Sequence, residues 1–341
     1  MATFIVDQNG DDAAAEAAGT TLREALEQAD ASSGPDRIEF DETVFTGGAN
    51  NTITLTQGEL VLESDVTSDG DIDGIGTADF TISGDATGDD ATRLDAAGNT
   101  ITDVATNANT SDNSRVIRVD DRTEATLNGL VITGGEASGF IEGAGILIER
   151  DAELTITNSS ISGNSGSEGG GIANRGTLTI TSSDVSFNEA TSGGGIRNRG
   201  ELEITSSTIT NNSARDGGGL LNSGTNGNEG FASLVNVTVA DNTATSTGGG
   251  IQAYEFDFTQ EDVGTIELRN VTITGNSAGG DGGGLYIRES TVFAYNSIIL
   301  GNGAPTDPDV GLAGTIPVFF DGGGNILTGA PSDVFDQTQT N

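Results

Sequence analysis

The sequence predicts an all-β fold, a right-handed parallel β-helix with three-strand coils of about 24 residues and a short N-terminal α-helical cap. Three observations predict it. Apolar residues recur at intervals of 24, as Ile172, Ile196 and Leu220 do. Apolar and polar residues alternate within each repeat, as over residues 178–181, which is typical of a strand with one buried face. Turn residues (Gly, Ser and Asn) separate three such short runs in every repeat.

Asparagines and glycines recur with the same period. Two sets of asparagines lie 24 residues apart: Asn164, Asn188 and Asn212, and Asn174, Asn198 and Asn222. Parallel coils stack at roughly 4.8 Å, so we expect these side chains to form ladders of amides that hydrogen-bond from coil to coil, in preference to contacting a ligand. The glycine triplets fit corners where the backbone needs a positive φ or lies very close to the next coil.

The composition suits thin coils with an acidic surface. The 341 residues hold 52 glycines and no cysteine, and 52 acidic residues against 13 basic ones give a net charge of -39. Every basic residue is an arginine. We therefore expect no nucleic-acid partner, no membrane insertion and a monomer in isolation. Three explanations of the acidity stay open, namely a highly soluble extracellular surface, adaptation to high salt, or several weak calcium sites.

Residues 1–45 differ from the repeats and predict an N-terminal cap of one strand, at residues 3–6, and one short helix. Thr21 and Glu24 form a capping box at the start of the helix, which runs to about Ala31. Its apolar stripe consists of Leu22, Ala25, Leu26 and Ala29. We expect the cap to cover the open end of the solenoid, which then fills residues 46–341 as one elongated domain.

The coils are less regular up to about residue 132, and three segments predict insertions that leave the coil, near residues 84–114, 223–232 and 252–264. Loops that project from a rigid scaffold often carry binding residues. The third insertion holds the ligand-binding candidates Tyr254, Phe256, Asp257 and Phe258. Exposed aromatic rings beside carboxylates are typical of carbohydrate-binding surfaces, while a small apolar cluster within the insertion is the simpler interpretation.

A metal hypothesis rests on residues 69–74, where Asp69, Asp71 and Asp73 offer oxygen ligands for calcium at alternate positions. The twelfth position, which would hold a bidentate glutamate in an EF-hand, is Phe80. An Asp-rich turn between strands explains the segment equally well. We expect no required cofactor, with calcium as the one candidate.

The catalytic candidates are Arg175, Arg197 and Arg199, which lie on one predicted corner of the coil. A polysaccharide lyase needs a base beside a uronate and a cation that neutralises the carboxylate, and arginines serve such roles. In an acidic chain, ion pairs with neighbouring carboxylates such as Glu201 or Glu203 explain the same arginines more simply. A glycoside hydrolase would need two facing carboxylates, and no such pair stands out.

Three segments resemble known bacterial families. The segment TTLREALEQAD followed by DRIEF resembles the CSLREA-type N-terminal cap of surface β-helix proteins, without its cysteine. The segment from Asn296 to Leu327 is similar to the terminal segment of choice-of-anchor β-helix proteins, and the Gly-Gly-Gly-Ile units resemble polymorphic outer membrane protein repeats. The resemblances imply a secreted or cell-surface protein of a bacterium. Because no signal-peptide pattern precedes the cap, we expect an excised domain or export without one.

These observations favour a non-catalytic adhesive or structural module of a larger exported protein, whose partner is a polysaccharide or a surface protein. The alternative is a carbohydrate-active enzyme, a polysaccharide lyase or glycoside hydrolase, that acts on an anionic polysaccharide. The resemblances indicate fold and export and leave activity open, since one fold hosts many functions.

Overall fold

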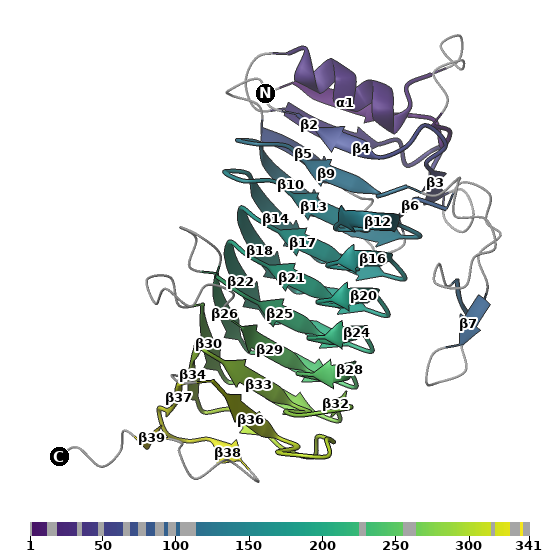
Figure 1. Cartoon of the computed structure of the whole chain (residues 1–341). Helices are drawn as coiled ribbons and strands as arrows, with labels where there is room; N and C mark the ends of the chain where they lie inside the picture. Colours follow the sequence, from purple (N-terminus) through teal and green to yellow (C-terminus); the bar gives the residue numbers. More distant parts are fainter. Residues whose placement is uncertain are drawn as a thin grey trace.

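Parallel strands stack coil upon coil along one axis in the computed structural model of the chain (Figure 1). It describes residues 2–11, 19–32, 36–46, 51–63, 69–73, 80–85, 92–94, 100–102, 114–224, 230–254, 264–314, 318–327 and 335–336. Within these ranges the strand pairs are parallel, except for the antiparallel pair β7 (Thr92–Leu94) and β8 (Thr100–Thr102). The predicted right-handed parallel β-helix is therefore confirmed.

Three long sheets form the walls of the tube, and their strands follow one another in each coil. Sheet A has 12 strands: β1 (Thr3–Val6), β2 (Asp36–Phe40), β5 (Asp69–Asp73), β10 (Glu124–Asn128), β14 (Glu153–Thr157), β18 (Thr177–Thr181), β22 (Glu201–Thr205), β26 (Phe231–Val235), β30 (Thr265–Arg269), β34 (Thr291–Tyr295), β37 (Val318–Asp321) and β39 (Phe335–Asp336). Sheet B has 10: β3 (Thr52–Thr54), β6 (Phe80–Ser83), β11 (Leu130–Thr133), β15 (Ser160–Ser162), β19 (Asp184–Ser186), β23 (Thr208–Thr210), β27 (Thr238–Ala240), β31 (Thr272–Thr274), β35 (Ile298–Ile299) and β38 (Ile326–Leu327). Sheet C has nine: β4 (Leu60–Leu62), β9 (Ile117–Val119), β13 (Ile146–Ile148), β17 (Ile172–Asn174), β21 (Ile196–Asn198), β25 (Leu220–Asn222), β29 (Ile251–Tyr254), β33 (Leu285–Arg288) and β36 (Val310–Ala313).

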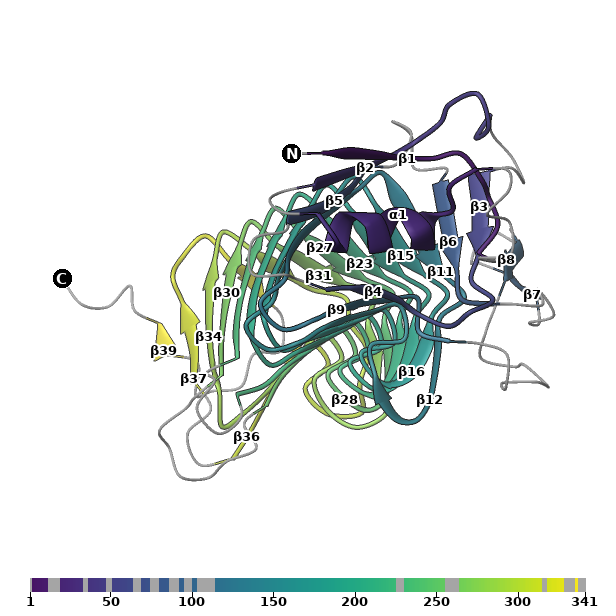
Figure 2. The ribbon, with the colours of Figure 1, turned by 90° about the horizontal axis from the view of Figure 1, so that it is seen from above.

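A fourth sheet, which the sequence did not predict, lies between sheets B and C in six coils. Sheet D consists of β12 (Glu136–Glu142), β16 (Ser165–Glu168), β20 (Glu189–Ser192), β24 (Ser213–Asp216), β28 (Thr243–Thr247) and β32 (Ser277–Ala278). Seen from above, it forms a lobe outside the tube (Figure 2). Its strands escaped prediction because they do not line the core, so they lack the alternation of apolar and polar residues.

The core runs the length of the tube and follows the predicted alternation. In β18 the side chains of Leu178 and Ile180 are fully buried, while the threonines between and beside them are half-buried. The recurring Ile172, Ile196 and Leu220 are also fully buried and pair in register, coil over coil. Register thus sets the whole pattern, because a shift by one residue would turn every apolar side chain outward.

The glycine triplets join sheet D to sheet C for the two predicted reasons. Gly193, the first of its triplet, has φ +66°. A Cβ on the second, Gly194, would lie 2.4 Å from the carbonyl oxygen of Ser213. Glycine is therefore required at the first position by conformation and at the second by the closeness of the next coil.

Asparagine ladders connect the coils at two corners, as predicted. At the corner after sheet B, each Asn donates its backbone N–H and its Nδ2–H to the side-chain oxygen of the Asn in the next coil. The members are Asn164, Asn188, Asn212, Asn242, Asn276 and Asn302. The second ladder, after sheet C, joins Asn174, Asn198 and Asn222 through 2.7 Å bonds. A shorter ladder of serines, Ser159, Ser183 and Ser207, lies between sheets A and B.

Asp309 ends the longer asparagine ladder. It pairs in register with Gly284, the third glycine of the preceding coil, since Val310 pairs with Leu285. One carboxylate oxygen of Asp309 accepts the backbone N–H of Asn302 at 3.0 Å and its Nδ2–H at 2.9 Å. The side chain of Asp309, at the position that Gly284 holds in the preceding coil, thus replaces the next asparagine of the ladder. As an ionised carboxylate it accepts hydrogen bonds and donates none.

Helix α1 (Leu22–Asp30) lies across the N-terminal end of the tube (Figures 1 and 2). The predicted capping box of Thr21 and Glu24 is present, and the predicted apolar stripe is buried. Arg23 fixes the helix to the first coil, because its Nε binds Asp11 at 2.8 Å and its Nη2 donates to the carbonyl of Gly58 at 2.7 Å. The predicted α-helical cap is confirmed as an element of the fold.

We expect Asn188→Ala to lower the free energy of unfolding by about 3 kcal/mol or more, because it removes four buried hydrogen bonds and leaves backbone partners unsatisfied. Urea unfolding followed by circular dichroism measures the change. The control is Asn270→Gly, which removes two exposed amide hydrogen bonds and keeps the positive φ of +57° accessible. Its cost should stay below about 1 kcal/mol, and equal costs for the two variants would contradict a stabilising role of burial.

Candidate functional site

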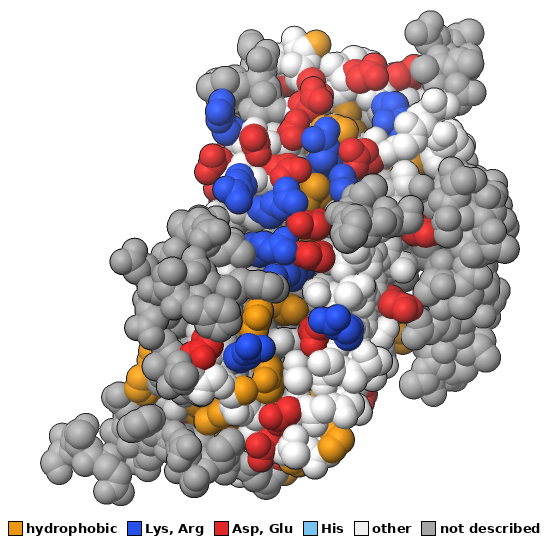
Figure 3. All heavy atoms as spheres, viewed as in Figure 1, with side chains coloured by type: hydrophobic (Ala, Val, Ile, Leu, Met, Phe, Trp, Pro, Cys, Tyr) orange, Lys and Arg blue, Asp and Glu red, His pale blue; other side chains and the backbone are white. Residues whose placement is uncertain are grey.

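Arginines gather on the outer face of sheet C, although the chain as a whole is strongly acidic. Seven of the 13 arginines lie in the strands of sheet C or within two residues of them: Arg115, Arg118, Arg150, Arg175, Arg197, Arg199 and Arg288. Figure 3 shows basic and acidic side chains mixed over this face. We call it the arginine face.

The turn from sheet D covers the middle of the arginine face. In the six consecutive strands from β13 to β33 of sheet C, the residue after the first core residue points away from the core, yet its side chain is almost fully buried. These residues are Leu147, Ala173, Arg197, Leu221, Gln252 and Tyr286. The turn from sheet D to sheet C covers them, since a Cβ on Gly217 would lie 2.7 Å from that of Leu221. Contacts with a ligand are therefore left to the residues at the edges of the strands.

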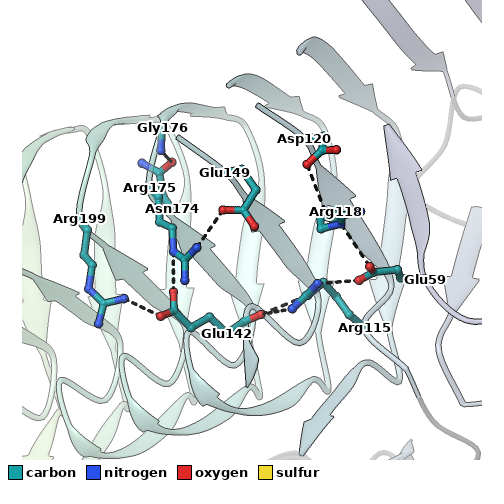
Figure 4. A network of polar contacts seen from close by, with 10 residues as sticks. All are labelled: Glu59, Arg115, Arg118, Asp120, Glu142, Glu149, Asn174, Arg175, Gly176 and Arg199. Carbon is teal, nitrogen blue, oxygen red and sulfur yellow. Dashed lines mark hydrogen bonds and ion pairs between the residues drawn. The ribbon is translucent and has the colours of Figure 1, made fainter. Parts of the chain in front are cut away.

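Glu142, at the end of β12, binds two arginines that lie one coil apart (Figure 4). Its Oε2 accepts from Nε of Arg175 at 3.0 Å, and its Oε1 pairs with Nη1 of Arg199 at 2.9 Å. Burial raises the pKa of Glu142, but the hydrogen bond from Arg175 and the charges of both arginines outweigh burial and lower it. The pKa of Arg175 is raised, mainly by the hydrogen bond to Glu142. Both groups are charged at neutral pH.

The same network continues toward the N-terminus. Arg115 donates to the backbone carbonyl of Glu142 and pairs with Glu59 at 2.6 Å (Figure 4). Arg118 pairs with Glu59 at 3.2 Å and with Asp120 at 3.1 Å. Side chains that alternate in charge thus connect five successive coils, from β4 to β21.

Arg197 is the least satisfied member of the face. It is 2% exposed, and its Nε and Nη1 make no hydrogen bond within the described residues. Its nearest carboxylate oxygen, on Glu168, lies 3.6 Å from Nε, and Glu168 also binds Arg199. Burial, followed by the charge of Arg199, lowers the pKa of Arg197 to about 10. The guanidinium remains charged at neutral pH, in a place that disfavours charge.

Toward the C-terminus the face offers aromatic rings. The guanidinium of Arg288 lies 5.1 Å from the ring centre of Tyr254, its register partner in the neighbouring strand. Tyr286 is 9% exposed, and burial, followed by the charge of Asp281, raises its pKa. Two of the three tyrosines in the chain therefore lie on the arginine face.

A hollow of about 470 Å³ opens where sheet C turns into sheet A. We call it the corner hollow. Its lining residues come from four successive coils: Arg150, Asp151, Arg175, Gly176, Thr177, Gly200, Glu201 and Phe231. Its volume is within the range of small-molecule sites, roughly 300–1,000 Å³.

The structure brings together the three arginines that the sequence singled out, all within the arginine face. Their carboxylate partners are Glu142 and Glu168 from sheet D and Glu149, which directly follows β13, and not Glu201 or Glu203 as expected. Tyr254 lies on the face, whereas Phe256, Asp257 and Phe258 fall outside the described residues. The backbone of Asp69, Asp71 and Asp73 forms β5, which corrects the expected turn, but their side chains are not described. In the described part of the chain, no cluster of three or more acidic residues is arranged to hold a metal ion.

Sequence reasoning missed Glu142, Arg150 and Phe231. Arg150 had a signal, since it lies two residues after β13, which precedes β17 in the stack, and occupies nearly the same place in its coil as Arg175. Glu142 and Phe231 had none, because each follows an irregular stretch of the repeat. The described residues contain no helix with the length and hydropathy needed to cross a bilayer.

Comparison with known proteins gives one match. Residues 270–288 match the Chlamydia polymorphic membrane protein repeat. This segment contains β31, β32 and β33, so it corresponds to part of one coil. No curated protein and no solved structure matches the chain significantly. The chain is thus a parallel β-helix with at least one segment similar to a polymorphic membrane protein repeat.

We expect Arg197→Met to stabilise the protein by about 1–3 kcal/mol at pH 7, because it removes a poorly paired buried charge and keeps most of the volume. The pKa of Arg197 is lower in the folded state, so the charge destabilises the folded state below about pH 10. The advantage of the variant should therefore shrink as the pH rises above 10. Urea unfolding between pH 7 and 11 measures it. Arg199→Met is the control and should destabilise, since Arg199 has two ion pairs.

We expect Glu142→Gln to remove an acid-sensitive part of the stability. The pKa of Glu142 is lowered by folding, so its carboxylate stabilises the protein above the unfolded pKa of about 4.5, and the contribution is lost as the pH falls below that value. The wild type should therefore exceed the variant by more than about 1 kcal/mol at pH 7 and lose this advantage toward pH 3. Thermal unfolding at both pH values tests this, and a pH-independent difference would contradict it.

Proposed function

We propose that the chain is a non-catalytic adhesive module of a bacterial surface or secreted protein and that the arginine face is its ligand-binding surface. The observation that carries the proposal is the gathering of arginines and tyrosines on one wall of a solenoid whose net charge is -39. Such a wall offers cations and aromatic rings to polysaccharides or to a surface protein, while the other acidic surfaces repel polyanions.

The repeat match supports a surface location, since its family model describes a membrane protein repeat. The proposal includes a CSLREA-type cap at the N-terminus and a choice-of-anchor-type segment at the C-terminus. These belong together on an exported chain, and the solenoid would then act as a rigid spacer that presents the arginine face. Eleven spacings between the 12 strands of sheet A make it roughly 50 Å long.

The protonation of the arginines favours binding over catalysis. A lyase base must be neutral when it takes a proton from the substrate. Arg175 has a raised pKa, and Arg197, whose pKa is about 10, is buried beneath sheet D. The carbohydrate-active enzyme remains the alternative, as does a weak calcium requirement through Asp69, Asp71 and Asp73.

We expect the protein to be retained on a column of anionic polysaccharide without producing new chain ends, equally with calcium and with a chelator. Arg288→Ala should weaken retention, because it removes a cation that has no ion pair among the described residues, together with its contact with Tyr254. The matched control is Arg269→Ala on sheet A, which removes the same kind of contact, at 4.7 Å from Tyr295. Elution salt and a reducing-end assay are the measurements.

Each other outcome contradicts part of the proposal. New chain ends would establish the enzyme and direct mutagenesis to Arg175, Arg197 and Arg199. Equal loss in both variants would move the binding surface away from sheet C. Absence of both retention and new ends across the panel would exclude polysaccharide adhesion and leave a structural spacer with a protein partner.

A further inference from the structure

We propose that the corner hollow binds one carboxylated sugar unit, a uronic acid residue of a polysaccharide. This inference rests on the proposed function and adds the ligand class and the place where the ligand is recognised. The hollow is lined from four coils, so one ligand would contact several rungs of the solenoid at once.

Arg175 offers a fixed donor to the hollow. Its Nε is held by Glu142 at 3.0 Å and its Nη1 by Glu149 at 2.8 Å, whereas Nη2 has no hydrogen-bond partner among the described residues. Two ion pairs fix the plane of the guanidinium, and the raised pKa keeps it charged. A carboxylate that binds Nη2 therefore loses little affinity to the ordering of this side chain.

Arg150 supplies the free charge. It is exposed at the rim of the hollow and makes no ion pair within the described part of the chain. The charge of Arg175 is already balanced by Glu142 and Glu149. One carboxylate on the ligand would thus neutralise Arg150 while also accepting from Arg175, and it would form charge-assisted hydrogen bonds with both.

The other lining residues select for hydroxyl groups and an apolar ring face. Asp151 and Glu201 are exposed and have no ion pair among the described residues, so their oxygens can accept from hydroxyl groups. Thr177 adds a hydroxyl that donates or accepts. Phe231 is half-buried at the other end of the hollow and offers an aromatic surface for C–H groups.

Charge limits the ligand to a single carboxylate. Asp151 and Glu201 stand beside the two arginines, and a second anionic group would meet them in a chain whose net charge is -39. Sulfated or phosphorylated sugars with several charges are therefore disfavoured. One carboxylate, several hydroxyls and an apolar ring face together describe a uronic acid.

The test compares two sugars, galacturonate and galactose. They differ only at C6, where galacturonate has a carboxylate and galactose has a hydroxymethyl group. We expect NMR titration of the whole protein at low salt to show binding of galacturonate, at least about 10-fold weaker binding of galactose, and a similar loss for galacturonate with Arg150→Ala. The control Arg215→Ala removes an arginine that is 67% exposed on sheet D, and it should leave binding unchanged.

Equal binding of the two sugars, or unchanged galacturonate binding in Arg150→Ala, would overturn the inference. Glutamate binding as strong as galacturonate binding would overturn the sugar assignment in favour of an acidic peptide. The two proposals fail separately: polymer retention that does not depend on Arg150 leaves the adhesive function standing without this site. Galacturonate binding without polymer retention leaves the site standing without the adhesive function.

Discussion

In-register hydrogen bonding between successive coils is the constraint on which the rest of the structure depends. The hydrogen bonds between parallel strands place each residue directly above its counterpart in the next coil. A position that needs an apolar side chain or an asparagine in one coil therefore needs it in the neighbouring coils as well. The Ile172, Ile196 and Leu220 positions show this inside the tube, and the asparagine ladders show it at the corners. The two lengthened coils keep the same register, since Leu220 pairs with Ile251 and Ile251 with Leu285. The paired strands thus keep their register even where more residues lie between them in the sequence.

The charge of the surface is organised by the same stacking. Arg175 and Arg199 lie one above the other, and one carboxylate, from Glu142 on sheet D, binds both. These pairs join sheet D to sheet C as well as one coil to another, and they leave selected guanidinium nitrogens free to face solvent. An acidic solenoid can thus present a cationic wall in which most arginines have a carboxylate partner among the described residues, with Arg197 as the poorly paired member.

The repeat made most of the fold predictable, and irregular parts account for what was missed. The alternation of apolar and polar residues and the fixed period predicted the strands of sheets A, B and C and the asparagine ladders. Thr21 and Glu24 predicted where the helix begins. Sheet D lies outside the core, so strands such as Ser165–Glu168 carry no apolar signal. The candidate site depends on that sheet. Arg175, Arg197 and Arg199 could be placed on one corner from their spacing alone, but their partner Glu142 could not, because its position follows from a register shift between β12 and β16.

The ladder that ends at Asp309 has a direction. Every amide in it donates toward the C-terminal coil and accepts from the N-terminal one, so their dipoles align and each strengthens the next. A carboxylate at the donating end of such a row is favoured for the reason that an anion is favoured at a helix N-terminus. It also has no proton to pass on. A coil with one more asparagine can be inserted anywhere along the row, or removed from it, without changing the hydrogen bonds of the others. The ladder cannot be continued beyond Asp309, because an ionised carboxylate has no N–H or O–H to donate to another coil.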